Sequence, residues 1–201
     1  MQHHQECEQI AGAGMSELPE NKQIDVGYFT LTGEVNSDMV RRVFDGLSLF
    51  SREKLRTVHI LLQSNGGYVS DGICLYNTLR NAPVDLVMYN AGAVASIGVI
   101  VFLAAEQRVA SDTARFMIHK SHATAPTGAG PDALKIIADG LMADDRRTET
   151  ILQRHVSLPQ SMWDVYAGSD LHVASEEALD IGLISRIGHF APPHGHIVHP
   201  I

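Results

Sequence analysis

The chain has 201 residues, of which 45% are hydrophobic, and a formal net charge of -8. This length suits one domain with a substantial core. The acidic balance, with no basic cluster, argues against nucleic acid or an anionic membrane surface as a partner. No apolar run approaches the roughly 20 residues of a membrane span, and the first residues lack a signal-peptide layout, so we expect a cytoplasmic protein.

The predicted elements begin after a polar N-terminal arm, residues 1–24, which we expect to be flexible. Apolar periodicity then predicts strands over 26–35, 57–63, 84–89, 108–109, 115–118 and 183–187, and helices over 37–50, 70–81, 95–105, 131–155 and 175–182. This alternation predicts an α/β fold with a largely parallel sheet, whose binding sites lie at strand ends. The Pro- and His-containing tail, residues 191–201, is expected to be loosely ordered.

Cysteine and histidine placement indicates neither a metal site nor a cofactor site. The two cysteines are Cys7 in the polar arm and Cys74 in an apolar helical pattern, which is too few for a thiolate cluster and argues against a structural disulfide. His119 and His122 could form a metal pair, but no nearby carboxylate or cysteine completes such a site. We therefore expect no metal and no cofactor.

A single hydroxyl, Ser96, interrupts the small and apolar run AGAVASIGVIVFLAA at residues 91–105, where a helix is predicted to begin. Its oxygen could cap the free backbone amides of that helix. The same amides could instead stabilise an oxyanion beside a nucleophilic serine. A nucleophilic serine needs a base and a carboxylate that orients the base. Partners elsewhere in the chain therefore decide between the two hypotheses.

Three further features supply candidate partners. His119 ends the apolar strand RFMIHK, so its imidazole is expected where α/β sites form. The turn SNGG at residues 64–67 directly follows a buried strand, and Gly67 could donate an amide to an oxyanion, although a tight turn is the commoner use of two glycines. The candidate aspartates are Asp164, Asp170 and Asp180, and the residues alone do not choose among them.

Four blocks of the chain, taken in order, resemble the ClpP family, the serine peptidase subunits of barrel-shaped Clp proteases: SNGGYVSDGICLYNTL, NAGAVASIGVIVFLAA, RFMIHK and DLHVASEEALDIGLI. The resemblance implies a ClpP/crotonase-like spiral of strand-helix repeats over residues 25–190, with 131–155 as a protruding handle helix. It also implies catalytic roles for Ser96, His119 and Asp170, and oxyanion-hole roles for the amides of Gly67 and Ile97.

The same resemblance implies a serine endopeptidase that cleaves peptides or unfolded proteins inside a homo-oligomeric barrel of two stacked rings. Two departures stand out. Asn65 occupies the position where the family usually has Pro, which keeps a turn-forming residue. Residues 1–24 lack the family's segment that builds the axial loops, which puts the partnership with an AAA+ unfoldase in question.

Alternative functions stay open at the level of sequence. A crotonase-type acyl-CoA hydratase or isomerase shares the spiral fold, and a catalytically inactive ring subunit would keep it. A Ser/Lys peptidase would recruit Lys120, but neighbouring strand residues face opposite ways, so Lys120 and His119 cannot both serve Ser96. A hydrolase with a GxSxG elbow is disfavoured because Val94 stands where that motif needs Gly.

Overall fold

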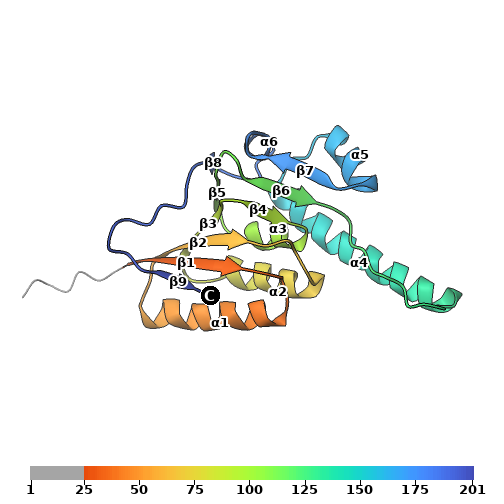
Figure 1. Ribbon diagram of the computed structural model, residues 1–201, viewed down its shortest axis with the longest axis horizontal. Coiled ribbons are helices and arrows are strands. Elements are labelled where there is room, and N and C mark those ends of the chain that lie inside the picture. Colours follow the sequence, from red (N-terminus) through yellow and green to blue (C-terminus); the bar gives the residue numbers. More distant parts are fainter. Residues whose placement is uncertain (1–24) are drawn as a thin grey trace, which may run out of the picture.

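The computed structural model describes residues 25–201 (Figure 1), so the predicted arm at 1–24 lies outside the described residues. Six strands form the main sheet in the order β8-β5-β3-β2-β1-β9, and all neighbouring pairs are parallel. These strands are β1 (Val26–Thr32), β2 (Thr57–Gln63), β3 (Asp85–Asn90), β5 (Gln107–Ala110), β8 (Arg186–Ile187) and β9 (Val198–Pro200). The predicted α/β fold with largely parallel strands is confirmed.

A second, three-stranded sheet carries the part of the chain that matters for chemistry. Its strands are β4 (Ala93–Ala95), β6 (Arg115–Ile118) and β7 (Leu171–Ala174), in the order β4-β6-β7. β4 pairs parallel with β6, and β6 pairs antiparallel with β7. This small sheet therefore brings together three chain segments that are far apart in the sequence.

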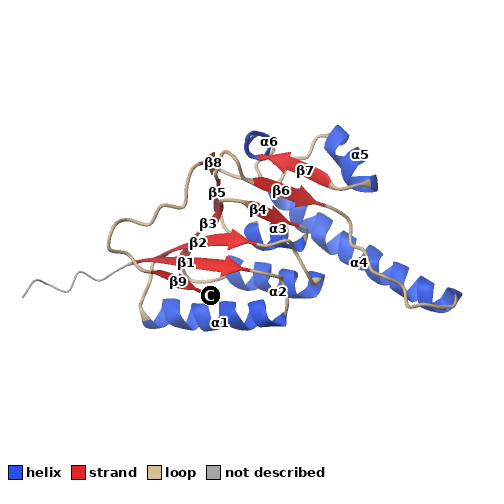
Figure 2. Cartoon of the chain, viewed as in Figure 1, coloured by secondary structure: helices blue, strands red, loops and turns tan. Residues whose placement is uncertain are grey.

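Residues 25–201 form six helices: α1 (Ser37–Arg52), α2 (Val69–Arg80), α3 (Ile97–Phe102), α4 (Pro131–His155), α5 (Gln160–Gly168) and α6 (Ser175–Asp180). In Figure 2, α1 and α2 lie along one face of the main sheet. α1 begins at an Asn36 cap, whose side chain accepts hydrogen bonds from the amides of Asp38 and Met39. Its buried face, which includes Met39, Val43 and Phe50, packs into the core.

The long helix α4 extends away from the body of the molecule (Figure 1), as the sequence predicts for a handle. Only its C-terminal end is anchored by fully buried residues, Ile151 and Leu152. Further out, the large apolar side chains of Leu134, Ile136 and Met142 are exposed. None of the helices between residues 25 and 201 is long and apolar enough to cross a membrane.

The tail, residues 191–201, has no helix or strand up to residue 197 but ends in the edge strand β9, which its composition does not predict. β9 pairs with β1 at the sheet edge, with Phe29 opposite His199. The Ile201 side chain that follows is only 9% exposed. The Ile201 side chain packs against the Gly46 backbone in α1. Proline is tolerated in β9 because an edge strand needs hydrogen bonds on one side only. Packing against β1 and α1 thus orders a segment that sequence composition describes as loose.

Candidate active site

Ser96 lies at the junction of β4 and α3, in a backbone conformation that residues other than glycine rarely adopt. Its φ is 54° and its ψ is -133°, and it is one of two non-glycine residues with positive φ among residues 25–201. A strained backbone conformation persists only where the surrounding structure enforces it, and such residues are often found at functional sites. The Ser96 amide donates to the Met117 carbonyl at 2.7 Å. The Ser96 side chain makes no capping hydrogen bond to α3, so the capping hypothesis does not describe it.

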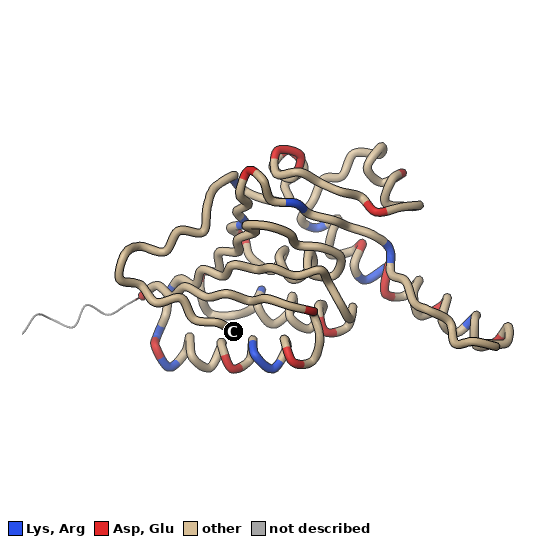
Figure 3. The backbone as a smooth tube through the Cα atoms, in the orientation of Figure 1, with Lys and Arg blue, Asp and Glu red and all other residues tan. Residues whose placement is uncertain are grey.

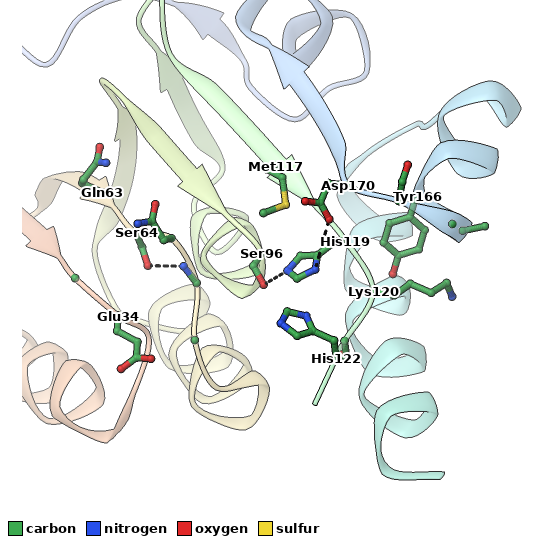
Figure 4. A pocket seen from close by; sticks show the side chains of 18 residues that line it. Glu34, Gln63, Ser64, Ser96, Met117, His119, Lys120, His122, Tyr166 and Asp170 are labelled. Atoms are coloured by element: carbon green, nitrogen blue, oxygen red, sulfur yellow. Dashed lines mark hydrogen bonds and ion pairs between the residues drawn. The ribbon is translucent and has the colours of Figure 1, made fainter. Parts of the chain in front are cut away.

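His119 lies beside Ser96 because β4 and β6 are paired in parallel, with Ala95 opposite Met117. The chain continues past both strands on the same edge, and the His119 Nε2 atom comes within 2.7 Å of the Ser96 Oγ atom (Figure 4). This distance is ordinary for a hydrogen bond that a hydroxyl donates. In the tautomer that carries its proton on Nδ1, His119 can therefore accept the serine proton.

Asp170 is close to His119 but does not reach hydrogen-bond distance. It directly precedes β7, whose pairing with β6 sets Leu171 opposite Ile118. The His119 Nδ1 atom and the Asp170 Oδ1 atom are 3.9 Å apart, and the aspartate side chain is 57% exposed. Of the three candidate aspartates, Asp170 lines the cavity around Ser96, whereas Asp164 bonds to Gln160 on the exposed side of α5. The structure thus brings Asp170 near the imidazole without completing a bond.

The surroundings of His119 keep its imidazole neutral at neutral pH. Burial lowers the pKa of His119 below its usual range, and the neighbouring His122 lowers it further, while Asp170 and Asp145 act in the opposite direction. The rings of His119 and His122 lie 5.0 Å apart between centroids. A neutral imidazole is the form that can accept a proton from Ser96.

The SNGG turn packs directly against Ser96. A methyl group on Gly66, at φ +101°, would come within 2.6 Å of the Ser96 Cβ, and one on Gly67, at φ +152°, would come within 2.2 Å of the Val35 carbonyl oxygen. Both positions therefore require glycine. Gly66 is a site residue that sequence reasoning missed, although the double glycine was its signal. Its amide donates to the Ser64 Oγ atom at 3.1 Å.

The two predicted oxyanion donors flank the nucleophile. Gly67 lines both cavities next to Ser96, and Ile97 is the first residue of α3. The first amides of a helix have no acceptor within the helix, so the Ile97 amide is one of those that remain for another acceptor. Gly72 makes room for the Ile97 side chain, since a methyl group there would lie 2.2 Å from its Cγ1 atom.

Two adjoining cavities meet at Ser96 and His119. The larger, of about 1020 Å³, runs from Glu34 and Asn65 to Lys120 and Asp170. The smaller, of about 360 Å³, has apolar walls that include Val99, Ile100 and Leu152. In Figure 4, Glu34 and Gln63 lie across the larger cavity from His122. The site is therefore a large cavity with a smaller pocket beside it that has several apolar walls.

Lys120 is turned away from Ser96, toward α4 and α5 (Figure 4). Its Nζ atom donates to the Glu149 Oε1 atom at 2.8 Å. This orientation offers no support for a Ser/Lys pair. Among residues 25–201, no group of three or more His, Cys, Asp or Glu side chains is arranged to hold a metal ion.

The parallel α/β fold with its projecting helix is the fold of a family of proteases, as comparison with known proteins shows. The chain belongs to the Clp protease family, because the family model described as Clp protease matches residues 16–190. This confirms the family resemblance found in the sequence.

The relatives have similar lengths and low identity. The chain is 25% identical over 178 residues to the ATP-dependent Clp protease proteolytic subunit 3 of Rhizobium johnstonii, covering 85% of this chain and 91% of the relative. It is 28% identical over 162 residues to the subunit 3 of Rhodococcus jostii, covering 78% of each chain. A solved structure of a ClpP1 mutant from Listeria monocytogenes has a TM-score of 0.69 at 21% identity, covering 83% of this chain and 92% of that one. This likeness shows the ClpP fold.

Proposed function

We propose that the chain is a serine endopeptidase that cleaves peptides or unfolded proteins through Ser96, His119 and Asp170. The observation that carries the proposal is the 2.7 Å contact between the His119 Nε2 and Ser96 Oγ atoms, made where Ser96 adopts a positive φ. A serine hydroxyl becomes an effective nucleophile when a neutral imidazole takes its proton. The lowered pKa of His119 supplies that neutral form.

The reaction follows from the positions of these groups. The Ser96 oxygen attacks the carbonyl carbon of the scissile bond while His119 takes the serine proton. The amides of Gly67 and Ile97 stabilise the negative oxygen of the tetrahedral intermediate. The carbon–nitrogen bond then breaks, and His119 gives its proton to the leaving amine. A water molecule, deprotonated by His119, then attacks the acyl carbon. The bond to the Ser96 oxygen breaks, His119 returns the proton to that oxygen, and the acid product leaves.

Asp170 is proposed to orient the imidazole and stabilise its charged form. At 3.9 Å from the His119 Nδ1 atom, it needs to approach by about 1 Å to form a hydrogen bond. Catalytic hydrogen bonds often tighten only when substrate is bound. We therefore expect substrate or assembly to close this gap.

The two cavities suit an extended chain with an apolar side chain next to the cleaved bond. The larger cavity has a volume of about 1020 Å³, and the smaller one, walled in part by Val99, Ile100 and Leu152, also borders Ser96. The relatives are named as proteolytic subunits of ATP-dependent proteases. We accordingly propose a homo-oligomeric barrel of stacked rings, with an AAA+ unfoldase as a candidate partner for folded substrates.

The test is covalent labelling with a fluorophosphonate, followed by peptide mapping. The expected result is modification of Ser96, with labelling and peptide cleavage both lost in Ser96→Ala. Ser48→Ala on exposed α1 is the matched control and should keep both. A crotonase-type hydratase, or a ring subunit without activity, would leave the protein unlabelled and would overturn the proposal.

A further inference from the structure

The two residues that follow His119 are tied to the inner half of α4. The Ser121 amide donates to the Asp145 Oδ1 atom at 2.7 Å. The Lys120 Nζ atom donates to the Glu149 Oε1 atom at 2.8 Å and lies 3.8 Å from the Asp145 Oδ2 atom. We refer to these four residues as the Lys120 clamp: Lys120, Ser121, Asp145 and Glu149.

The two carboxylates of the clamp are partly shielded from water, whereas the Lys120 side chain is 41% exposed. The side chain of Asp145 is only 14% exposed, and that of Glu149 is 27% exposed. The Lys135–Asp139 pair further out on α4 is open to solvent, with side chains 72% and 56% exposed. Exposed pairs contribute little, because water and salt screen them, whereas a shielded carboxylate needs its partners. The geometry of the clamp is therefore under stronger constraint than that of a surface pair.

Tyr166 of α5 lies beneath the Lys120 ammonium group of the clamp. Its ring centroid lies 5.2 Å from the Lys120 Nζ atom, and the tyrosine is 2% exposed. Burial, together with the nearby charges of Glu149 and Asp145, raises the pKa of Tyr166, so the phenol stays neutral. Figure 4 shows the Lys120 and Tyr166 side chains next to each other on the side of His119 away from Glu34. The clamp thus joins the connection after β6 to α4, and its Lys120 also contacts α5 through Tyr166.

His119 itself lacks comparable support from the sheet. β6 ends at Ile118, and residues 119–126 have no regular secondary structure. The His119 imidazole is hydrogen-bonded to Ser96, whereas Asp170, at 3.9 Å, is too far away to form a hydrogen bond with it. What fixes the backbone of Lys120 and Ser121 therefore also fixes the direction in which His119 points.

We infer that Asp145, with Lys120 and Glu149, is a positioning residue that holds the His119 imidazole in line with the Ser96 hydroxyl. This inference rests on the proposed function and deepens it. Neither Asp145 nor Glu149 lines either cavity, so these two carboxylates act through the residues that they hold. Loss of the clamp should therefore slow the chemical step and leave substrate binding nearly unchanged.

The test compares two substitutions at one position. Asp145→Asn keeps an oxygen that accepts from the Ser121 amide, and Asp145→Ala removes it. Misplacement of a catalytic group by about 1 Å can cost on the order of 100-fold in rate. We expect Asp145→Ala to lower kcat for a short peptide and the rate of Ser96 labelling by about 30- to 100-fold, with KM changed by less than about threefold. Asp145→Asn should recover most of this loss.

The pH profile separates the charge of Asp145 from its positioning role. Among the groups that face His119, His122 lowers its pKa, whereas Asp170 and Asp145 raise it. Either substitution removes the Asp145 charge and should move the acidic limb of kcat/KM to lower pH. Only Asp145→Ala should also lower the plateau. A merely structural effect would change the amount of folded protein and would not separate the two variants in this way.

Lys120→Met provides a second variant should Asp145→Ala fail to fold. Its matched control is Lys135→Met, because Lys135 makes an exposed 2.7 Å pair with Asp139 on α4. Lys120→Met should lower kcat clearly, and Lys135→Met should not. Wild-type rates in Lys120→Met and Asp145→Ala would overturn the inference while Ser96 labelling of the wild type sustains the proposed function. An unlabelled wild type would overturn both.

Discussion

At the scale of single residues, the site depends on how closely the backbone of the SNGG turn approaches Ser96. Gly66 touches the nucleophile, since a methyl group there would meet the Ser96 Cβ and Oγ atoms at 2.6 Å and 3.0 Å. The contact explains why two adjacent glycines stand at this turn and why both have positive φ. The local chemistry of Ser96 is thus set by backbone on one side and by imidazole on the other.

Gly66→Ala tests this contact. The added methyl group has no space, and a φ of +101° is strained for alanine, so Ser96 must shift away from His119. We expect labelling of Ser96 to fall by about 100-fold or more. Gly140→Ala is the control, because nothing lies within 4 Å of a methyl group there. Normal labelling in Gly66→Ala would show that Ser96 does not need this packing.

The charge on His122 should be visible in the pH dependence of the reaction. A protonated His122 disfavours a second positive charge on His119 and so lowers the pKa of His119. Replacing His122 by Asn removes that repulsion, so the pKa of His119 should rise. The acidic limb of kcat/KM should then move to higher pH, as measured by initial rates across pH 4 to 8. A limb that stays in place or moves to lower pH would contradict this coupling.

At the scale of elements, segments with a clear apolar pattern could be predicted, and a segment without one could not. β2, β6 and α4 lie where the apolar pattern sets them. β4 has three residues, and its extended conformation depends on pairing with β6, which no local pattern encodes. The predicted helix at 95–105 accordingly begins later, at Ile97, because Ala95 belongs to β4 and Ser96 to the turn.

The candidate site divides in the same way. Ser96 and His119 could be predicted because each ends or begins an apolar element, and parallel strands bring such ends together. Asp170 was identified through the family resemblance, and its 3.9 Å gap to His119 could not be foreseen. The Gly66 contact and the Lys120 clamp depend on distances between segments remote in sequence. Such distances are properties of the packed fold.

The edge strand β9 provides a prediction at this scale. Ile201 is 9% exposed and packs on α1, whereas Ile197 in the same tail is 71% exposed. Ile201→Ala should therefore lower the free energy of unfolding by about 1–3 kcal/mol, near the lower end for buried Ile. Ile197→Ala should change it by less than about 0.5 kcal/mol. Urea denaturation of the two variants makes the comparison, and equal losses would show that β9 does not hold the tail.

At the scale of the whole molecule, charges of both signs are mixed on the surface, whereas large apolar side chains are exposed on the outer part of α4. Acidic and basic residues alternate along α1 and are interspersed on α4 (Figure 3). The outer part of α4 also exposes large apolar side chains, with Ile136 at 72% and Met142 at 52%. A projecting helix with such side chains suits contact with another copy of the chain.

Assembly should respond to a charge placed on this helix. We expect wild-type protein to sediment as a ring assembly of many subunits at micromolar concentration. Ile136→Asp should shift it to smaller species, because an exposed apolar contact would become a buried charge in the assembly. Arg41→Met, in an exposed ion pair on α1, is the control. A wild-type monomer would contradict the proposed barrel.

The central claim, that Ser96 forms an acyl-enzyme with help from His119, is tested most directly by rapid-quench mass spectrometry with an activated peptide ester. The account predicts a transient increase in protein mass by the acyl group, located on the peptide that contains Ser96. This mass should be absent in Ser96→Ala and strongly reduced in His119→Ala. Ester turnover without any acylated protein, or acylation at another residue that survives in Ser96→Ala, would contradict the account.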